Sequence, residues 1–344
     1  MTINVIKPIK IVTFLVYAII AYGNSYQTSN YKIIKNNNVT YSGPLKLNEI
    51  ATLNLEDLEK QEIIISRIHS IDVDRNGNIF IGDDESRVIV LSPNFKFIRV
   101  IGNHGEGPGE FKNVSWIRIS PNNELFVQDS KLKRISRFNS NGIFVSSFKY
   151  YGFSYNFEIS DEFVYISNLA FLTKDGLVDK FTIEGEKLKS LIINDEESKI
   201  IHQSGNSGFI KTINNHKLLY SYPYPYKVLI LDKNDVTKIE FSLNRKEFVG
   251  LTSNSKNVEG RFLGGDLPSR IKGVYNYLNE YIAVACQLKD KNVIDFFTME
   301  GKYINSINLP EDHELMCIKN KLLYTVNRGF NNYPSIKVFE LIKQ

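Results

Sequence analysis

Histidine is the residue type in this sequence best suited to bind a metal ion or to transfer a proton near neutral pH. None of the histidines forms an H-x-x-x-H pair. A zinc site needs about three protein ligands that converge in space, and here they could meet only if the fold brings distant segments together. His69 and His104 are the pair that we consider for such a site. The other histidines are His202, His216 and His313.

The sequence contains no pattern typical of a nucleophilic enzyme. There is no G-x-S-x-G motif, and no cysteine and histidine lie in a local sequence context typical of a catalytic pair. Cys286 and Cys317 lie in apolar, strand-like contexts, which favours two buried small hydrophobic residues, although a disulfide between them stays open. Residues 102–111 are rich in glycine, but they lack the Gly-Lys-Ser/Thr ending of a phosphate-binding loop. We therefore expect no catalytic residue and no cofactor.

Aromatic and arginine side chains in irregular loops are better candidates for ligand binding. Residues 222–226 read Tyr-Pro-Tyr-Pro-Tyr, and residues 244–270 form a long connection that contains both glycine and arginine. Tyrosine beside arginine is typical of surfaces that bind proteins, peptides or sugar rings. The alternative is that the tyrosines only cover the ends of structural units. The candidate ligand-binding residues are His104, Tyr222, Tyr224, Arg261, Arg270 and Arg328.

The charge of the chain argues against a nucleic-acid partner. The formal net charge is +4 over 344 residues, and Lys7 and Lys10 of the N-terminal segment contribute to it. The remainder is too close to balance to indicate a nucleic-acid-binding surface.

The N-terminal segment resembles an export signal. Lys7 and Lys10 precede an apolar run over residues 11–20, and small residues follow near Gly23. We predict a signal peptide over residues 1–23 and a polar linker over residues 24–43. The protein is then exported to the periplasm or cell envelope, and an uncleaved N-terminal anchor is the alternative.

Repeated units of β-strands would have to position the candidate residues. Asp83 and Asp129 end two strand patterns that read alike and lie 46 residues apart, which is close to the repeat length of propeller blades. Each unit reads as short antiparallel strands joined by Asn-Gly or related turns. The six units cover residues 68–102, 116–148, 157–193, 209–243, 273–307 and 315–342.

The two ends of the chain complete each other in this arrangement. The sixth unit lacks its fourth strand, and residues 44–55 alternate apolar and polar residues as an otherwise unpartnered strand does. A ring of blades avoids exposed sheet edges only when it closes. We therefore predict an all-β, six-bladed β-propeller over residues 44–344, in which residues 44–55 pair with residues 336–342.

Residues 102–111 are then a crossover between the first two blades rather than a ligand site. Their glycines permit sharp turns, and we expect Phe111 to pack between the blades. Asp83 and Asp129 end equivalent strands, where an aspartate most often accepts backbone N–H bonds and fixes a turn.

The repeats resemble the six-bladed propellers of the NHL-repeat type, and more closely a bacterial exported subgroup of uncharacterised function. The resemblance rests on residues 79–83, 88–91 and 101–111 and on the lead-in strand over residues 45–50. It is specific in the first two blades and degenerate in the others. NHL-type propellers act as ligand-binding or protein-binding platforms, some bind RNA, and one branch contains metal-dependent amidating lyases.

These observations predict an exported, monomeric propeller that binds a protein, peptide or carbohydrate ligand. The crossovers between blades and the loops between second and third strands emerge on one rim, where we expect the ligand to bind. A metal-dependent lyase or hydrolase with its site at the central channel, built around His69 and His104, is the alternative that the resemblance implies.

Overall fold

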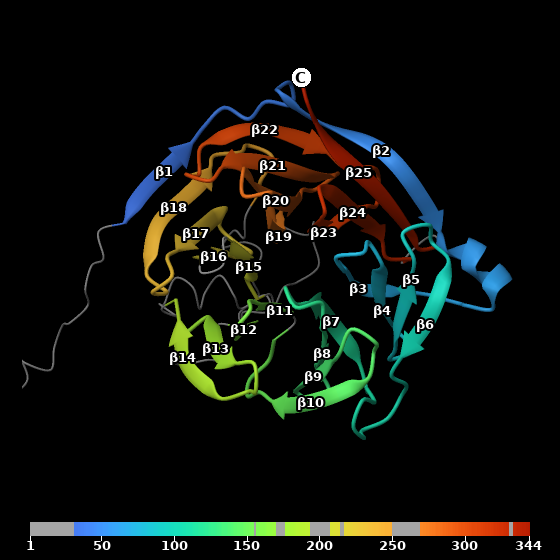
Figure 1. Ribbon diagram of the computed structural model, residues 1–344. Helices are drawn as coiled ribbons and strands as arrows, with labels where there is room; N and C mark the ends of the chain where they lie inside the picture. The colour runs from blue at the N-terminus through green and yellow to red at the C-terminus, as the bar shows by residue number, and fades with distance from the viewer. Residues whose placement is uncertain are drawn as a thin grey trace, which may run out of the picture.

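The structure is a computed structural model that describes residues 31–154, 156–169, 176–192, 207–213, 217–249, 269–329 and 333–344. Within these ranges the strands form six sheets arranged as a ring (Figure 1). The six-bladed β-propeller predicted from the sequence is therefore confirmed. The predicted signal peptide, residues 1–23, lies outside the described residues.

The first three blades are each built from four consecutive antiparallel strands. In each of them the first strand lies nearest the central axis and the fourth lies outermost (Figure 1). Blade one contains β3 (Ile68–Val73), β4 (Ile79–Asp83), β5 (Val88–Leu91) and β6 (Phe97–Ile101); blade two contains β7 (Val114–Ile119), β8 (Leu125–Asp129), β9 (Arg134–Phe138) and β10 (Phe144–Lys149); blade three contains β11 (Asn156–Ile159), β12 (Phe163–Ser167), β13 (Val178–Thr182) and β14 (Lys187–Leu191).

Blades four to six follow the same plan, and two of them include strands from the N-terminal region. A short 3-10 helix, η1 (Leu55–Gln61), connects this region to blade one. Blade four contains β15 (Phe209–Ile213), β16 (Lys217–Ser221), β17 (Lys227–Leu231), β18 (Thr237–Leu243) and β1 (Lys32–Asn36); blade five contains β19 (Arg270–Tyr277), β20 (Tyr281–Gln287), β21 (Asn292–Thr298) and β22 (Tyr303–Asn308); blade six contains β23 (Glu314–Lys319), β24 (Leu322–Asn327), β25 (Ser335–Lys343) and β2 (Leu45–Asn54).

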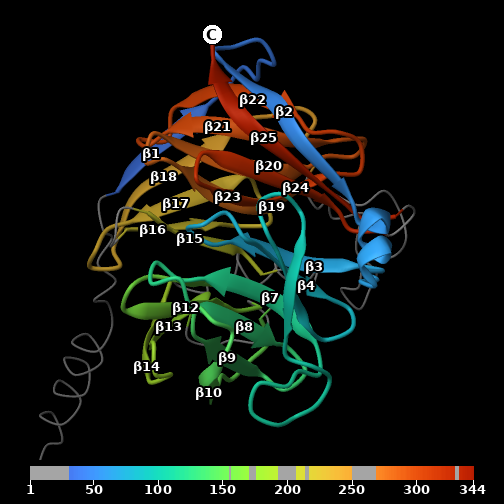
Figure 2. The same cartoon turned by 45° about the vertical axis from the view of Figure 1, so that its right-hand side comes forward.

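The ring closes through β2 and β25, as the sequence predicts. The two strands are antiparallel, with Leu45 opposite Lys343 and Asn54 opposite Ser335. The blue N-terminal strand and the red C-terminal strand lie side by side in both views (Figures 1 and 2). This pairing satisfies backbone groups of β25 that would otherwise form an exposed sheet edge.

The N-terminal residues before β2 differ from the prediction of a linker. Residues 32–36 form β1, which pairs in parallel with β18 as a fifth strand of blade four. The Asn36 amide group donates hydrogen bonds to the carbonyls of Ser242 and Gly301, at 3.0 and 2.9 Å, and so joins blade four to blade five. Ile33 and Ile34 are the only apolar residues of this strand, and they lie within a polar, Asn-rich stretch. A pattern of two apolar residues is too short to predict a strand.

The crossover between blades one and two packs as predicted. Phe111 is fully buried among apolar side chains of both blades, and its ring centroid lies 5.8 Å from that of Phe138. Gly102 has a φ of +75°, and a Cβ at this position would lie 2.2 Å from the Phe111 ring. The glycine is therefore required both by the backbone conformation and by the close approach of the ring.

The two equivalent aspartates fix loops, as the sequence also predicts. The Asp129 carboxylate accepts backbone N–H bonds from Lys112, Lys131 and Leu132, at 2.7 to 3.0 Å. Asp83 accepts a hydrogen bond from the Arg87 guanidinium at 2.8 Å. Both carboxylates are fully buried, so their hydrogen bonds are used within the fold.

The direction of the strands defines two faces of the ring. In every blade the first strand begins, and the second ends, on the face where the crossovers between blades lie; we call this the crossover face. The turns between first and second strands lie on the opposite face, which we call the turn face. The six first strands, β3, β7, β11, β15, β19 and β23, surround the central channel, and neighbouring ones contact each other around the whole ring.

Candidate functional site

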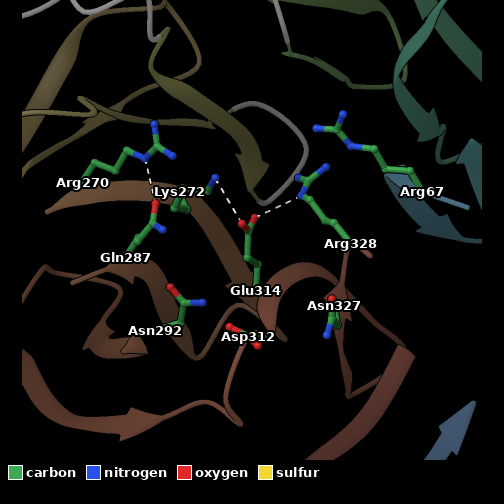
Figure 3. Close-up of a pocket in the computed structure, with 9 residues that line it drawn as sticks. All are labelled: Arg67, Arg270, Lys272, Gln287, Asn292, Asp312, Glu314, Asn327 and Arg328. Atoms are coloured by element: carbon green, nitrogen blue, oxygen red, sulfur yellow. Dashed lines mark hydrogen bonds and ion pairs between the residues drawn. The ribbon is translucent and has the colours of Figure 1, made fainter. Parts of the chain in front are cut away.

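Two adjoining cavities open on the crossover face at the end of the central channel. Their volumes are about 370 and 470 Å³, and they share Arg67, Lys272 and Arg328. We call the two cavities together the channel mouth. The first is lined by Arg67, Arg270, Lys272, Gln287, Asn292, Asp312, Glu314, Asn327 and Arg328 (Figure 3). The second is lined by Arg67, His69, Asn113, Ser115, Trp116, Ser130, Asn156, Ser207, Phe209, Lys272 and Arg328.

Every blade contributes a side chain to the channel mouth, because the lining residues lie at equivalent positions of the repeat. They precede or begin a first strand, as His69 and Glu314 do, or follow a second strand, as Ser130 does. Closure of the ring fixes these strand ends relative to one another. The mouth is therefore assembled before any ligand arrives.

Glu314 lies between two cations in the first cavity. Its carboxylate is 3.3 Å from the Lys272 ammonium and 3.3 Å from Nε of Arg328 (Figure 3). Burial acts to raise the pKa of Glu314, but the charges of Lys272 and Arg328 outweigh this effect and hold the pKa below its usual value. Glu314 is therefore ionised at neutral pH and orients both cations.

Arg328 also anchors blade six to blade one. Its Nη1 donates hydrogen bonds to the backbone carbonyls of Ile68 and His69, at 3.2 and 2.5 Å. These bonds hold the guanidinium at the boundary between the two cavities. A guanidinium held in this way loses little conformational freedom when it binds an anion.

Among the described residues that line the first cavity, cationic side chains outnumber carboxylates. Four cations line it, Arg67, Arg270, Lys272 and Arg328, against the carboxylates of Asp312 and Glu314. The pKa of Lys272 is lowered by burial and by the neighbouring charges of Arg270 and Arg328. Burial, with Arg67 and Arg328, likewise lowers the pKa of His69. Burial is the largest cause of both shifts, and the neighbouring cations add to it.

The second cavity has a polar wall with aromatic rings beside it. The Asn113 amide donates a hydrogen bond to Ser130 Oγ at 2.6 Å, and Nδ1 of His69 lies 2.9 Å from the Val114 carbonyl. The rings of Trp116 and Phe209 pack against each other at a centroid distance of 6.3 Å. Short amide and hydroxyl groups therefore lie next to an apolar surface.

A layer of buried charged residues lies deeper in the channel. Arg118 Nε and Lys211 Nζ are each 2.8 Å from the Glu158 carboxylate, and Asp72 accepts the Ile119 N–H at 2.8 Å. Burial raises the pKa of Asp72, but Arg118 and other cations outweigh it and lower the pKa below its usual value. The layer comes from four successive first strands, β3, β7, β11 and β15. A smaller cavity lies on the turn face, where Ser160 and Asn276 help to line it.

The structure brings together two of the six predicted ligand-binding residues. Arg270 and Arg328 both line the first cavity. His104 is exposed on the crossover after blade one, where its backbone forms an isolated β-bridge with Phe111. It lines neither cavity of the mouth. Arg261 lies outside the described residues, as do His202 and His216.

The two predicted tyrosines are buried rather than displayed on the surface. Tyr222 is 5% exposed and Tyr224 is 4% exposed. The Tyr222 ring packs edge-on against Tyr220, at a centroid distance of 5.1 Å. Burial raises the pKa of Tyr224, and the nearby Arg270 opposes this shift. The structure thus favours the alternative in which these tyrosines cover a blade end, and Tyr224 packs beside a residue of the mouth.

The predicted pair for a metal site does not share a cavity. His69 lines the second cavity, whereas His104 does not. Among the described residues, no group of three or more His, Cys, Asp and Glu side chains is arranged to hold a metal ion. His313 lies with Nδ1 3.0 Å from Thr325 Oγ1 and Nε2 3.2 Å from Ser335 Oγ, within blade six.

The two cysteines are free and buried, so the disulfide left open by the sequence is absent. Cys286 lies on β20 of blade five and Cys317 on β23 of blade six. Burial raises the pKa of both thiols well above its usual value. A buried thiol with a raised pKa is a poor nucleophile.

Several residues of the mouth were missed from the sequence. Arg67, Lys272 and Glu314 lie far apart along the chain and in no recognisable motif. Their position near the start of a first strand could have predicted them as lining residues, because such positions converge on the channel in a closed ring.

None of the helices in the described part of the chain is long and apolar enough to cross a membrane.

Known structures share this architecture at low sequence identity. A Bacteroides fragilis protein described as exported superimposes with a TM-score of 0.62 at 13% identity, covering 91% of this chain and 100% of its own. A member of the duf4221 family from Bacteroides vulgatus gives a TM-score of 0.62 at 11% identity, covering 88% and 99%. Virginiamycin B lyase from Staphylococcus aureus gives 0.51 at 12% identity, covering 87% and 100%.

At such identities the likeness shows the fold alone. No curated protein matches the chain. The family DUF5128, described as 6-bladed beta-propeller, matches residues 23–261, which is more than half of the sequence. The chain therefore belongs to the DUF5128 family of 6-bladed beta-propellers.

Proposed function

We propose that this protein is an exported binding module whose ligand docks at the channel mouth on the crossover face. The observation that carries the proposal is the mouth itself, two adjoining cavities of about 370 and 470 Å³ lined by side chains from all six blades. Concave sites of this size with a few convergent polar groups are typical of ligand-binding sites.

The lining favours recognition over catalysis. Arg328 and Lys272 are held by hydrogen bonds and ion pairs, which suits them to orient a ligand. The ligand is a protein segment, a peptide or a glycan, and no nucleic acid is involved. The protein acts as a monomer in this proposal, because a single chain completes its ring of blades through the pairing of β2 with β25.

A metal-dependent lyase is not supported by a specific observation. The likeness to virginiamycin B lyase shows the fold alone, and His69 and His104 do not line one cavity.

Export is supported by the basic and apolar pattern of residues 1–23 and by a structural neighbour described as exported. N-terminal sequencing of the protein purified from its native envelope fraction tests this part of the proposal. Cleavage near Gly23 is expected, and full-length protein in the cytoplasmic fraction would contradict it.

A substitution that fills the mouth tests the binding site. Asn113 lines the second cavity and directly precedes β7, so Asn113→Trp should obstruct the cavity. The matched control is Asn141→Trp, at an exposed turn on the opposite face. Both variants and the unmodified protein are applied to arrays of peptides and glycans.

Signals that vanish with Asn113→Trp and persist with Asn141→Trp support binding at the mouth. Signals that survive in Asn113→Trp, with unchanged thermal unfolding of both variants, would locate the ligand elsewhere and overturn the proposal.

A further inference from the structure

Two asparagines that line the second cavity keep a side-chain oxygen available to accept a hydrogen bond. Nδ2 of Asn156 donates to Ser207 Oγ and to the Gly208 carbonyl, both at 2.9 Å, so both N–H groups are used and Oδ1 remains as the acceptor. Nδ2 of Asn113 donates to Ser130 Oγ at 2.6 Å. Within the described residues neither Oδ1 accepts a hydrogen bond. Because Asn156 is only 3% exposed, its acceptor belongs to the cavity rather than to the outer surface.

His69 adds a third acceptor to the lining of the second cavity. Its Nδ1 lies 2.9 Å from the Val114 carbonyl oxygen, and because a carbonyl can only accept, Nδ1 carries the proton. Burial lowers the pKa of His69, and the charges of Arg67 and Arg328 lower it further, so the ring is neutral at neutral pH. The other ring nitrogen, Nε2, is then an unprotonated acceptor.

A ligand that fits these acceptors must bring its own donors. Resting on the proposed function, we infer that the ligand is a neutral saccharide, whose hydroxyls donate to the three acceptors and whose ring lies against Phe209. Each hydroxyl carries one donor, and a sugar ring holds several of them around its edge. The acceptors come from blades one, two and three, so a ring with hydroxyls on several sides suits them.

Charged ligands fit the second cavity less well. Arg67, Lys272 and Arg328 line it, and no carboxylate is found among its lining residues in the described ranges, so a cationic ligand would be repelled. An anion needs N–H or O–H donors, whereas this wall presents lone pairs. Lys272 and Arg328 are engaged by Glu314, at 3.3 Å from each. A neutral ligand meets neither conflict.

The apolar side of the second cavity suits the C–H face of a sugar ring. Phe209 is half-buried, and its ring packs against Trp116 at a centroid distance of 6.3 Å. The volume of about 470 Å³ lies in the range of small-molecule sites. An extended peptide directs successive backbone N–H groups to opposite sides, so a short segment supplies fewer donors to one wall than a single sugar ring does.

Trp116 provides a local readout of binding, because it is the only tryptophan of the sequence and lines the second cavity. We expect at least one neutral disaccharide among cellobiose, lactose, mannobiose and galactobiose to change its fluorescence in a saturable way. The charged counterparts are digalacturonate for galactobiose and diglucosamine for cellobiose. Both should bind about tenfold or more weakly than the neutral disaccharide that binds best.

Matched variants separate the second cavity from the rest of the surface. Phe209→Leu removes the aromatic face and Asn113→Leu removes an acceptor, so each should weaken binding of that disaccharide by about two- to tenfold. Phe97→Leu, on the outermost strand of blade one, and Asn141→Leu, on the turn face, make the same changes at exposed positions and should leave binding unchanged. Thermal unfolding identifies a variant that fails to fold, and the other member of the cavity pair then decides.

Absence of a saturable change with every neutral disaccharide would overturn the inference. Tighter binding of digalacturonate or diglucosamine than of its neutral counterpart would overturn the neutral specificity. Unchanged affinity in both Phe209→Leu and Asn113→Leu would remove the ligand from the second cavity.

The array comparison of Asn113→Trp with Asn141→Trp decides the proposed function independently. Peptide signals that only Asn113→Trp abolishes, with no response to a neutral glycan, would uphold binding at the mouth and contradict the saccharide assignment.

Discussion

Replacing Asp295 by asparagine tests how the fifth blade is held. Asp295 lies on β21 and is fully buried, and its carboxylate oxygens are 2.7 and 2.8 Å from Nη1 of Arg245. It also accepts hydrogen bonds from the hydroxyls of Tyr226, at 2.9 Å, and Ser306. The Arg245 side chain is itself fully buried, so the substitution leaves its guanidinium with only the partly exposed carboxylate of Glu247, at 3.2 Å, as a counter-charge.

Removal of one partner from a buried ion pair costs about 3–5 kcal/mol. The lower end applies here, because asparagine keeps one oxygen that can accept from Tyr226 or Ser306. A loss of about 3 kcal/mol lowers the unfolding temperature by about 5 °C in a domain of about 300 residues, because the unfolding entropy is about 2.1 cal/mol/K per residue. Arg245 also donates to the Tyr41 hydroxyl at 2.7 Å, so its displacement should loosen the N-terminal segment as well.

The assay is urea unfolding followed by tryptophan fluorescence, with calorimetry for the unfolding temperature. The matched control is Asp57→Asn, because Asp57 forms an ion pair at 3.2 Å with Lys60 while both side chains are largely exposed. An exposed pair contributes about 0 to 1 kcal/mol. If Asp295→Asn were no less stable than Asp57→Asn, the reasoning from burial would be refuted.

Three further predictions concern closure, packing and pH. A chain that begins at residue 56 lacks β1 and β2 and leaves the outer edge of β25 unpaired. Size-exclusion chromatography should then show aggregates, and a soluble monomer would contradict the closure argument. Gly102→Ala should lower the urea-unfolding free energy by at least about 1–3 kcal/mol, because the positive φ strains alanine and the Phe111 ring lies in the way of its Cβ. Unchanged stability would contradict the requirement for glycine at this position. The pKa of Glu314 is lowered in the fold from 4.5, so its stabilisation is complete above that pH and is lost as the pH falls below it. Glu314→Gln should therefore show a smaller loss of stability between about pH 5 and pH 3 than the unmodified protein, and identical pH curves would exclude this contribution.

The architecture was largely predictable because its signals are local and repeated. Asp83 and Asp129 mark the same position in successive blades. The sixth unit lacks a fourth strand, and residues 44–55 are the strand pattern without a partner, so together they predict the last sheet. β1 was not predictable in this way, because its pairing with β18 depends on a distant sheet edge and its own pattern contains only two apolar residues.

The candidate site was only partly predictable. Arg270 and Arg328 were singled out by their loops and do line the mouth, whereas Tyr222 and Tyr224 were chosen by residue type and are buried. Which side of a loop faces solvent depends on the neighbouring blade, and the sequence of the loop does not contain that information. Glu314 was missed because a carboxylate at the start of a strand has no motif of its own.

The pairing of β2 with β25 has a consequence for how the protein is made. The ribosome synthesises β2 before blades one to five, while its partner β25 follows all of them. β2 must therefore wait until these five blades have been synthesised, and contacts so distant in sequence form slowly. Throughout that interval the unpaired segments are prone to aggregation, so this protein should refold slowly from denaturant and should benefit from chaperones during its biogenesis.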